Sequence, residues 1–329
     1  MTERAGCSRP RSPRAEFLIC GSPSAAFFSQ IAFFRMSLDS FGEEGRATRV
    51  VAVFGAEVRR PLPARWRRHF ERVEVHHAAP EEFLRSRFFA ASDLRFELVT
   101  PGVEVSCLCD ADTVLVRPLP ASFFEELDRS PAICGVVAHY PFPIASDHRG
   151  PDVRGGLYAG MPQGAAWDRL GEAVIGRPPS RPLRYTLLED PSDDRCPFYV
   201  NYGFLAGPPE MLRRLHRVLG EVQPHVARLL GNDFAGQAGI ALAVEKAGIP
   251  WRALPMRFNF PNDRDADRRH PGELGETILI HYLRDTVYDR HRIFAEPRAF
   301  GEFLSLDLVG SDRVFRDHVR GVTGGAYPF

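Results

Sequence analysis

Short apolar runs alternate with longer helical patterns along the first 140 residues of the chain. The runs within EFLIC, TRVVAVFGA, EVSCLCDADTVLV and ICGVVAHY are apolar on both faces of the strands that they predict, and ERVEVHHA predicts one more strand. Between them, AAFFSQIAFFRMSLDSFG and the segment 81–99 have the spacing of helices. Strands that are apolar on both faces and alternate with helices are typical of a mainly parallel sheet flanked by helices. We therefore expect an α/β fold.

Residues 141–196 interrupt this rhythm. They are rich in proline, glycine and charge, around one helical piece that contains Trp167. Order resumes with a strand in FYVNYGFLAGP, two helices, and strands in IPWRALP and ETILIHYL. Because neither a repeat nor a linker is visible, we expect a disordered tail at 1–14 and a single domain at 15–329 with an irregular insertion at about 141–196.

Composition limits the classes of partner and location. The 42 Lys and Arg residues balance 42 Asp and Glu residues, so no net charge favours a nucleic acid or an anionic membrane. No apolar run reaches the ~18 residues of a transmembrane segment. Glu16 and the segment 21–24 break the N-terminal apolar stretch, which therefore predicts a strand, a turn and a helix rather than a signal peptide. The six cysteines include no C-x-x-C pair, which argues against disulfides and a zinc site and indicates a reducing, cytoplasmic location.

Two aspartates at the end of an apolar strand are the first candidate for chemistry. Side chains two residues apart on an extended chain point to the same side, so Asp110 and Asp112 can converge on one cation. Clustered carboxylates suit Mg²⁺ or Mn²⁺, and the carboxyl end of a strand is where open α/β sheets bind ligands. The alternative is a solvated turn in which one aspartate caps a helix.

The D-x-D strand resembles that of nucleotide-sugar glycosyltransferases with the GT-A fold, especially the family 8-like group, and the resemblance spans roughly residues 16 to 290. FYVNYGFLAGP is similar to the family segment whose Asn-x-Gly turn contacts the donor sugar, which implies that role for Asn201 and Gly203. GQAGIALAVEKAGI resembles the helix that an Asp-Gln pair opens near the sugar. Gln237 is kept, but Gly236 stands at the aspartate position, and Asp233 is the nearest acid that could substitute for it.

The resemblance also implies a third metal ligand and a nucleotide site. ILIHYLRD looks like the late strand whose histidine completes the metal site, so His281 becomes the third ligand beside the two aspartates. The family's following glycine and lysine are missing, and Arg284 is the candidate for the charge on the diphosphate. Ser22 and Ser24 lie where such enzymes hold the nucleotide, although helix capping would also explain them. Arg95 is expected to reach the diphosphate, to support the D-x-D loop or to form a surface salt bridge.

Together these matches imply a glycosyltransferase that uses Mn²⁺ or Mg²⁺ and a nucleotide-sugar donor, with a UDP-sugar expected and retention of anomeric configuration suggested by the family. Asn201, Gln237 and Asp233 are the candidate catalytic residues. The acceptor is an unknown sugar, lipid or protein, and the insertion at 141–196 is the segment expected to face it.

Two other interpretations compete with this one. Asp110, Ala111, Asp112 and Thr113 also match the D-x-D-x-T motif of haloacid dehalogenase-type phosphatases, in which Asp110 would be the nucleophile. That motif belongs to the first strand of such folds, whereas here about ninety residues of predicted strands and helices precede it. A degenerate domain that binds a nucleotide sugar without turnover is the second alternative, favoured by the missing aspartate before Gln237.

Overall fold

The computed structural model describes residues 14–86, 88–141, 161–188, 195–231 and 234–329. The predicted N-terminal tail, except Arg14, and much of the predicted insertion lie outside the described residues, as does Asp233. Among the described residues, no helix combines the length and the apolar character that a membrane crossing requires.

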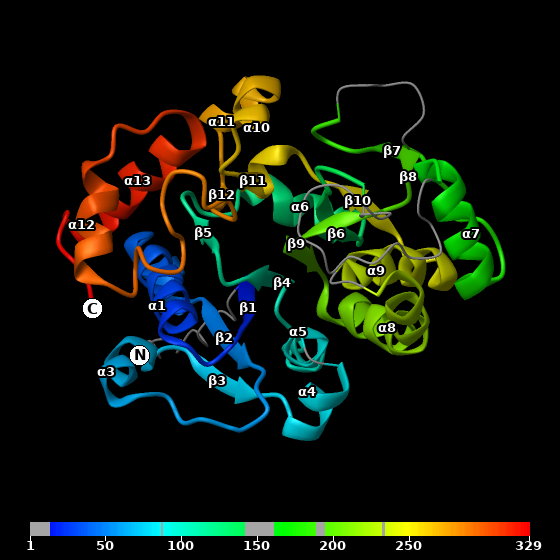
Figure 1. The fold of residues 1–329 in the computed structure, drawn as a ribbon, viewed down its shortest axis with the longest axis horizontal. Coiled ribbons are helices and arrows are strands. Elements are labelled where there is room, and N and C mark those ends of the chain that lie inside the picture. Colours follow the sequence, from blue (N-terminus) through cyan, green and yellow to red (C-terminus); the bar gives the residue numbers. More distant parts are fainter. Residues whose placement is uncertain (1–13, 87, 142–160, 189–194, 232–233) are drawn as a thin grey trace, which may run out of the picture.

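A seven-stranded sheet forms the centre of the molecule (Figure 1). In spatial order its strands are β10 (Trp251–Ala253), β6 (Ile133–Val137), β9 (Val200–Gly207), β4 (Val105–Asp110), β1 (Ala15–Gly21), β2 (Arg49–Phe54) and β3 (Glu74–His77). All neighbours pair in parallel except β9, which runs antiparallel to both β4 and β6. The predicted mainly parallel α/β sheet is therefore confirmed.

Helices cover both faces of this sheet, which explains why its central strands are largely apolar on both faces. In β1, Phe17 and Ile19 enter one core while Leu18 and Cys20 enter the other. The described helices, including short 3₁₀ turns, are α1 (Ala25–Ser40), α2 (Glu43–Ala47), α3 (Ala64–Arg67), η1 (Arg68–Phe70), α4 (Pro80–Ser86), α5 (Phe88–Glu97), α6 (Ala121–Arg129), α7 (Gln163–Ile175), α8 (Pro209–Leu230), α9 (Ala235–Ala247), η2 (Met256–Phe258), α10 (Arg264–Arg269), α11 (Pro271–Gly275), α12 (Pro297–Ser305) and α13 (Gly310–Thr323).

A second, three-stranded sheet adjoins the first where β4 ends. It consists of β11 (Phe260–Pro261), β12 (Leu279–His281) and β5 (Thr113–Leu115), with β12 antiparallel to β5. The remaining strands, β7 (Leu183–Arg184) and β8 (Arg195–Cys196), pair with each other inside the predicted insertion. The second sheet brings β12 next to the end of β4.

The D-x-D segment differs from the single strand that the sequence predicts. β4 ends at Asp110, Ala111 and Asp112 form a turn, and β5 begins at Thr113 in the other sheet. The hydroxyl of Thr113 donates to the carbonyl of Asp110 at 2.7 Å and closes this turn. The two carboxylates therefore converge across a turn and not along one extended strand.

Two smaller expectations have mixed outcomes. Ser24 does occupy the N-cap position of α1, but its side chain makes no capping hydrogen bond. Glu16, which breaks the apolar N-terminal run, is fully buried and accepts from Ser106 Oγ at 2.5 Å, Arg49 Nη1 at 2.6 Å and the Thr100 amide at 2.7 Å. Three donors offset the cost of burying this carboxylate, because burial of a charge without partners is unfavourable.

The five described cysteines are buried, and none of them forms a disulfide.

Candidate functional site

Asp110, Asp112 and His281 meet where the two sheets adjoin. Each offers one ligand atom, and these atoms all lie within 4.8 Å of one another. The backbone fixes this arrangement, because Thr113 pairs with His281 between β5 and β12, and the amide of Tyr282 donates to the carbonyl of Asp112 at 3.0 Å. Two carboxylates far from the histidine in sequence are thus held against it by main-chain hydrogen bonds.

The two carboxylates have opposite electrostatic environments. Burial opposes the ionisation of both. Oδ1 of Asp112 lies 3.2 Å from Nε2 of His281, and its Oδ2 lies 3.5 Å from Nε of Arg290. The attraction of these two groups outweighs burial and lowers the pKa of Asp112 to about 2. For Asp110 burial and the neighbouring Asp112 charge together raise the pKa. A pair of crowded acids of this kind gains from a cation between them.

The donor set fits a divalent metal. Two carboxylates and one imidazole suit Mn²⁺, and carboxylates suit Mg²⁺. Asp112 is only 18% exposed at its side chain, so its charge is mostly shielded from water. Nδ1 of His281 is buried and has no hydrogen-bond partner among the described residues, so the ring is held by packing and by its Nε2 contact with Asp112.

Gly203 leaves the space in which the His281 ring lies. A Cβ added at Gly203 would overlap Nδ1 of His281 and would lie 2.9 Å from Oδ1 of Asn259. Asn201 and Gly203 both lie within strand β9 and not in the turn that the sequence suggests. Oδ1 of Asn201 accepts from the amide of Gly203 at 2.8 Å and from Nδ2 of Asn259 at 3.1 Å. The Asn-x-Gly segment therefore stands directly behind the metal-ligand candidates.

Arg95 contacts the strand that carries Asp110. It is fully buried, and its Nη1 donates to the carbonyl of Cys109 at 2.7 Å while Nη2 donates to Ser92 Oγ at 2.7 Å. Its guanidinium also lies 5.3 Å from the centre of the Tyr202 ring. Of the three possibilities for Arg95, these contacts match support of the D-x-D loop, and its full burial contradicts a surface salt bridge.

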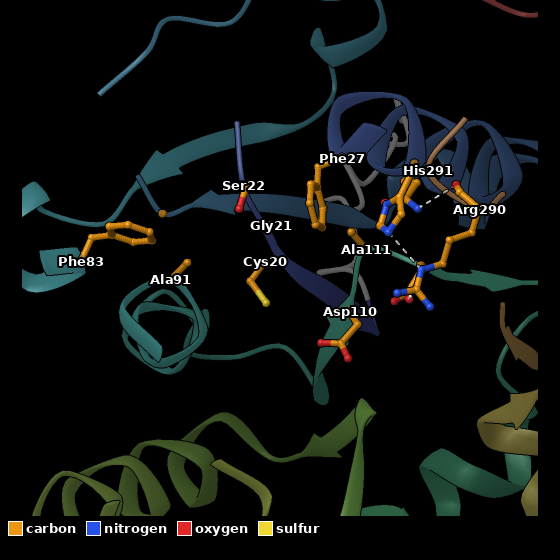
Figure 2. Close-up of a pocket in the computed structure, with 13 residues that line it drawn as sticks. Cys20, Gly21, Ser22, Phe27, Phe83, Ala91, Asp110, Ala111, Arg290 and His291 are labelled. Atoms are coloured by element: carbon orange, nitrogen blue, oxygen red, sulfur yellow. Dashed lines mark hydrogen bonds and ion pairs between the residues drawn. The ribbon is translucent and has the colours of Figure 1, made fainter. Parts of the chain in front are cut away.

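A pocket of about 220 Å³ opens beside the two aspartates. Figure 2 shows Phe83 and Ala91 on one side of it and Arg290 and His291 on the other. Ser22 lines the pocket, as do Gly21 and Phe27, whereas Ser24 is not among the lining residues. The pocket lies at the carboxyl end of β1 and β4, where parallel sheets bind ligands.

Sequence reasoning missed Arg290 and His291. Both line the pocket, and Gln30 holds their loop by donating from Nε2 to the carbonyl of Arg290 at 3.2 Å. The signal available in the sequence is the basic run Arg290–Arg292 soon after His281. Arg284, which the resemblance favoured, instead pairs with Asp263 at 3.0 Å and is 21% exposed.

The remaining family positions are less complete. Gln237 is half-buried near the start of α9. Gly236 packs so tightly that a Cβ there would lie 2.8 Å from the Phe89 ring and 3.2 Å from the Tyr202 ring. An aspartate at Gly236 would therefore require Phe89 to move. The part of the chain that would show Asp233 is not described.

The phosphatase interpretation is not favoured by the structure. The aspartates follow the fourth strand of the chain, and the pair lies against His281. Lys246, the one lysine in the sequence, forms an ion pair with Glu221 at 2.8 Å on the surface, with 39% of its side chain exposed. It is not available to bind a phosphate beside Asp110.

Comparisons with known proteins identify the fold. No protein-family model and no curated protein matches the chain. Among solved structures, the chain is similar to the galactosyltransferase LgtC in complex with donor and acceptor sugar analogs, with a TM-score of 0.50 and 11% identity over 95% of this chain and 97% of LgtC. An active-site mutant of LgtC gives the same values. Mouse xyloside xylosyltransferase 1 has a TM-score of 0.45 and 11% identity over 84% of this chain and 99% of its own. The chain has the GT-A glycosyltransferase fold.

Proposed function

We propose that this protein is a metal-dependent glycosyltransferase that uses a nucleoside-diphosphate sugar as donor. The observation that carries the proposal is the convergence of Asp110, Asp112 and His281 within 4.8 Å, beside a pocket at the carboxyl ends of β1 and β4 in a GT-A fold. Carboxylates beside a phosphate-sized opening are typical of sites in which Mg²⁺ or Mn²⁺ bridges protein and diphosphate.

The reaction requires charge stabilisation on the leaving group. The bond between the anomeric carbon and the diphosphate oxygen breaks, and the diphosphate leaves with both electrons. The acceptor hydroxyl forms the new bond to the anomeric carbon and gives its proton to the departing diphosphate. A bound divalent ion would act as a Lewis acid toward the departing diphosphate. Asp110, Asp112 and His281 would hold it, with Asp112 already ionised because its pKa is held near 2.

Two arginines are candidates for the positive charge beside the diphosphate. Arg290 lines the pocket and lies 3.5 Å from Asp112, whereas Arg284 is engaged with Asp263. With a cation held by Asp112, the guanidinium of Arg290 would be able to donate to a phosphate oxygen. Arg290 is therefore the better placed of the two.

The pocket offers suitable surfaces for a nucleotide. Phe27 and Phe83 present aromatic rings on which a base can stack, and Ser22 offers a hydroxyl at the end of β1. We take UDP as the first nucleotide to test, Mn²⁺ as the first metal, and retention of configuration as the expected outcome. Asn201, Gln237 and Asp233 remain the candidates for contact with the sugar, and a sugar, lipid or protein hydroxyl is the acceptor.

Donor hydrolysis tests this proposal without a known acceptor. Purified protein is incubated with a panel of UDP- and GDP-sugars, and nucleotide release is followed with Mn²⁺ or with EDTA. We expect release from at least one donor with Mn²⁺ only, and a loss of roughly a hundredfold or more in Asp112→Asn, since one lost electrostatic partner costs about that much. Asp317→Asn, at a 52% exposed position on α13, is the matched control. Wild-type rates in Asp112→Asn would refute the metal site.

A further inference from the structure

His139 is a buried histidine near the proposed site that none of the roles above uses. It follows β6, is 5% exposed, and sits beside β9, because the amide of Ala138 donates to the carbonyl of Tyr199 at 2.9 Å and Val137 pairs with Val200. The next residue along β9 is Asn201. His139 also lies close enough to His281 for their charges to interact.

The hydrogen bonds of Thr186 determine which nitrogen of His139 carries the proton. Nδ1 of His139 lies 2.8 Å from Oγ1 of Thr186, and that hydroxyl donates to the carbonyl of Val137 at 3.4 Å. With its proton directed at Val137, the hydroxyl oxygen accepts from Nδ1–H. In this tautomer Nε2 carries the lone pair.

Nε2 of His139 is therefore a buried acceptor that lacks a donor. It has no hydrogen-bond partner among the described residues. Protonation would not satisfy it, since burial, together with the charges of His281 and Arg284, lowers the pKa of His139 to about 3. A buried polar atom without a partner is destabilising, which makes a ligand donor the natural explanation.

The ring is held rigidly in this orientation. The amides of Thr186 and Leu187 donate to the carbonyls of Ala138 and His139 at 3.2 and 3.1 Å. Nε2 of His270 lies 3.1 Å from the carbonyl of Thr186 and fixes that segment from the side of α10. The segment that contains Thr186 belongs to the predicted insertion.

A hydroxyl group suits this acceptor, whereas a phosphate or a metal does not. Phosphate oxygens at neutral pH accept hydrogen bonds and cannot donate to a lone pair. A metal would require further ligands, and among the described residues the one such cluster consists of Asp110, Asp112 and His281, without His139. Neither His139 nor Thr186 lines the pocket assigned to the nucleotide. This leaves the sugar side of the site.

We propose that Nε2 of His139 accepts a hydrogen bond from a sugar hydroxyl in the transfer site, with Thr186 as the positioning residue that sets the tautomer. The inference rests on the proposed glycosyltransferase function and adds a sugar-binding residue to it. The hydroxyl belongs either to the donor sugar or to an acceptor sugar, and both present the same chemistry to Nε2.

Three variants separate this role from a structural one. His139→Asn keeps a donor toward Thr186 but removes the acceptor at Nε2, His139→Gln places an amide oxygen near the Nε2 position, and Thr186→Val removes the group that sets the tautomer. The affinity of each variant is measured by titration with UDP and with the UDP-sugar that most raises the melting temperature of the wild type, both in the presence of Mn²⁺. The rate of sugar transfer to water and to a panel of methyl glycosides is measured as well.

We expect His139→Asn to bind UDP as the wild type does. A tenfold or greater loss of affinity for the UDP-sugar identifies the donor sugar, and unchanged UDP-sugar affinity with a tenfold or greater loss of transfer to a methyl glycoside identifies the acceptor. His139→Gln should recover part of either loss, and Thr186→Val should show a smaller one. Unchanged sugar binding and transfer in His139→Asn, or an equal loss of UDP affinity, overturns the inference. If the wild type binds no nucleotide, the proposed function itself fails.

Discussion

At the scale of single residues, Gly203 sets the position of His281. Glycine is required at this position of β9 because a Cβ there would overlap the imidazole of His281. The sequence identified Gly203 through the Asn-x-Gly pattern, but it could not reveal that the partner is His281, which is 78 residues later in the chain. A contact of this kind depends on how two sheets meet.

Replacing Gly203 with alanine should displace the His281 ring. We expect Gly203→Ala to weaken Mn²⁺-dependent UDP binding at least tenfold and to lower the free energy of unfolding by about 1–3 kcal/mol, the usual cost of overpacking. Calorimetric titration and urea denaturation measure the two effects. The control is Gly220→Ala in α8, where a Cβ meets nothing within 4 Å and alanine should be neutral or slightly stabilising. Equal UDP affinities in the two variants would count against the role of Gly203.

Arg290 and Arg284 give a second comparison between residues. Because Arg290 borders the pocket and Asp112, Arg290→Gln should weaken UDP binding about tenfold or more in the presence of Mn²⁺. Arg284→Gln removes the ion pair with Asp263 and should change UDP affinity by no more than about twofold. Titration of both variants with UDP checks this, and the reverse ranking would assign the diphosphate to Arg284.

At the scale of elements, the sequence predicted the strands of the central sheet and the helices α1, α4, α5, α7, α8 and α9, but not which strands pair. Apolar runs locate β1, β2, β4 and β6 because burial on both faces leaves few polar positions. The division of the D-x-D segment into β4 and β5 was missed, since both halves are apolar and the break depends on pairing with β12. Seven of the described helices were not predicted, namely α2, α3, α6, α10, α11, α12 and α13. Of these, α13 packs against α1 and α12 packs against α13 (Figure 1), and their apolar residues join the same core as those of α1.

The contact between α13 and α1 should make stability depend on pH. Nε2 of His318 lies 2.7 Å from Oγ of Ser37, whose hydroxyl donates to the carbonyl of Leu115 at 2.5 Å. Burial lowers the pKa of His318 from 6.5 to about 4. Between these values the unfolded chain binds a proton that the native state does not, so stability falls as the pH is lowered from about 6.5 to 4.

We expect His318 to contribute about 1–3 kcal/mol to this loss of unfolding free energy. Urea denaturation at pH 7 and pH 4.5 measures it in the wild type and in His318→Gln, which keeps an N–H donor toward Ser37 but does not titrate. The variant should lose less stability on acidification. The same difference between the two pH values in both proteins would show that His318 does not contribute.

At the scale of the whole molecule, the architecture follows from the sequence better than the chemistry does. Alternating apolar strands and helices give the mainly parallel sheet, and the order of the motifs gives the GT-A fold. The cluster of Asp110, Asp112 and His281 was expected from the resemblance, whereas Arg290, His291 and His139 were not. Their roles depend on loops that approach the site from distant parts of the chain, which periodicity does not encode.

The most direct test of the central claim is a calorimetric titration of UDP into the wild type, Asp112→Asn and His281→Ala, with Mn²⁺ and with EDTA. If one cation held by the two aspartates and His281 links the protein to a nucleoside diphosphate, the wild type binds UDP with Mn²⁺ and loses at least tenfold in affinity with EDTA. Both variants should then bind weakly under either condition. Equal affinity with Mn²⁺ and EDTA in the wild type, or undiminished Mn²⁺-dependent binding in Asp112→Asn, would contradict the account.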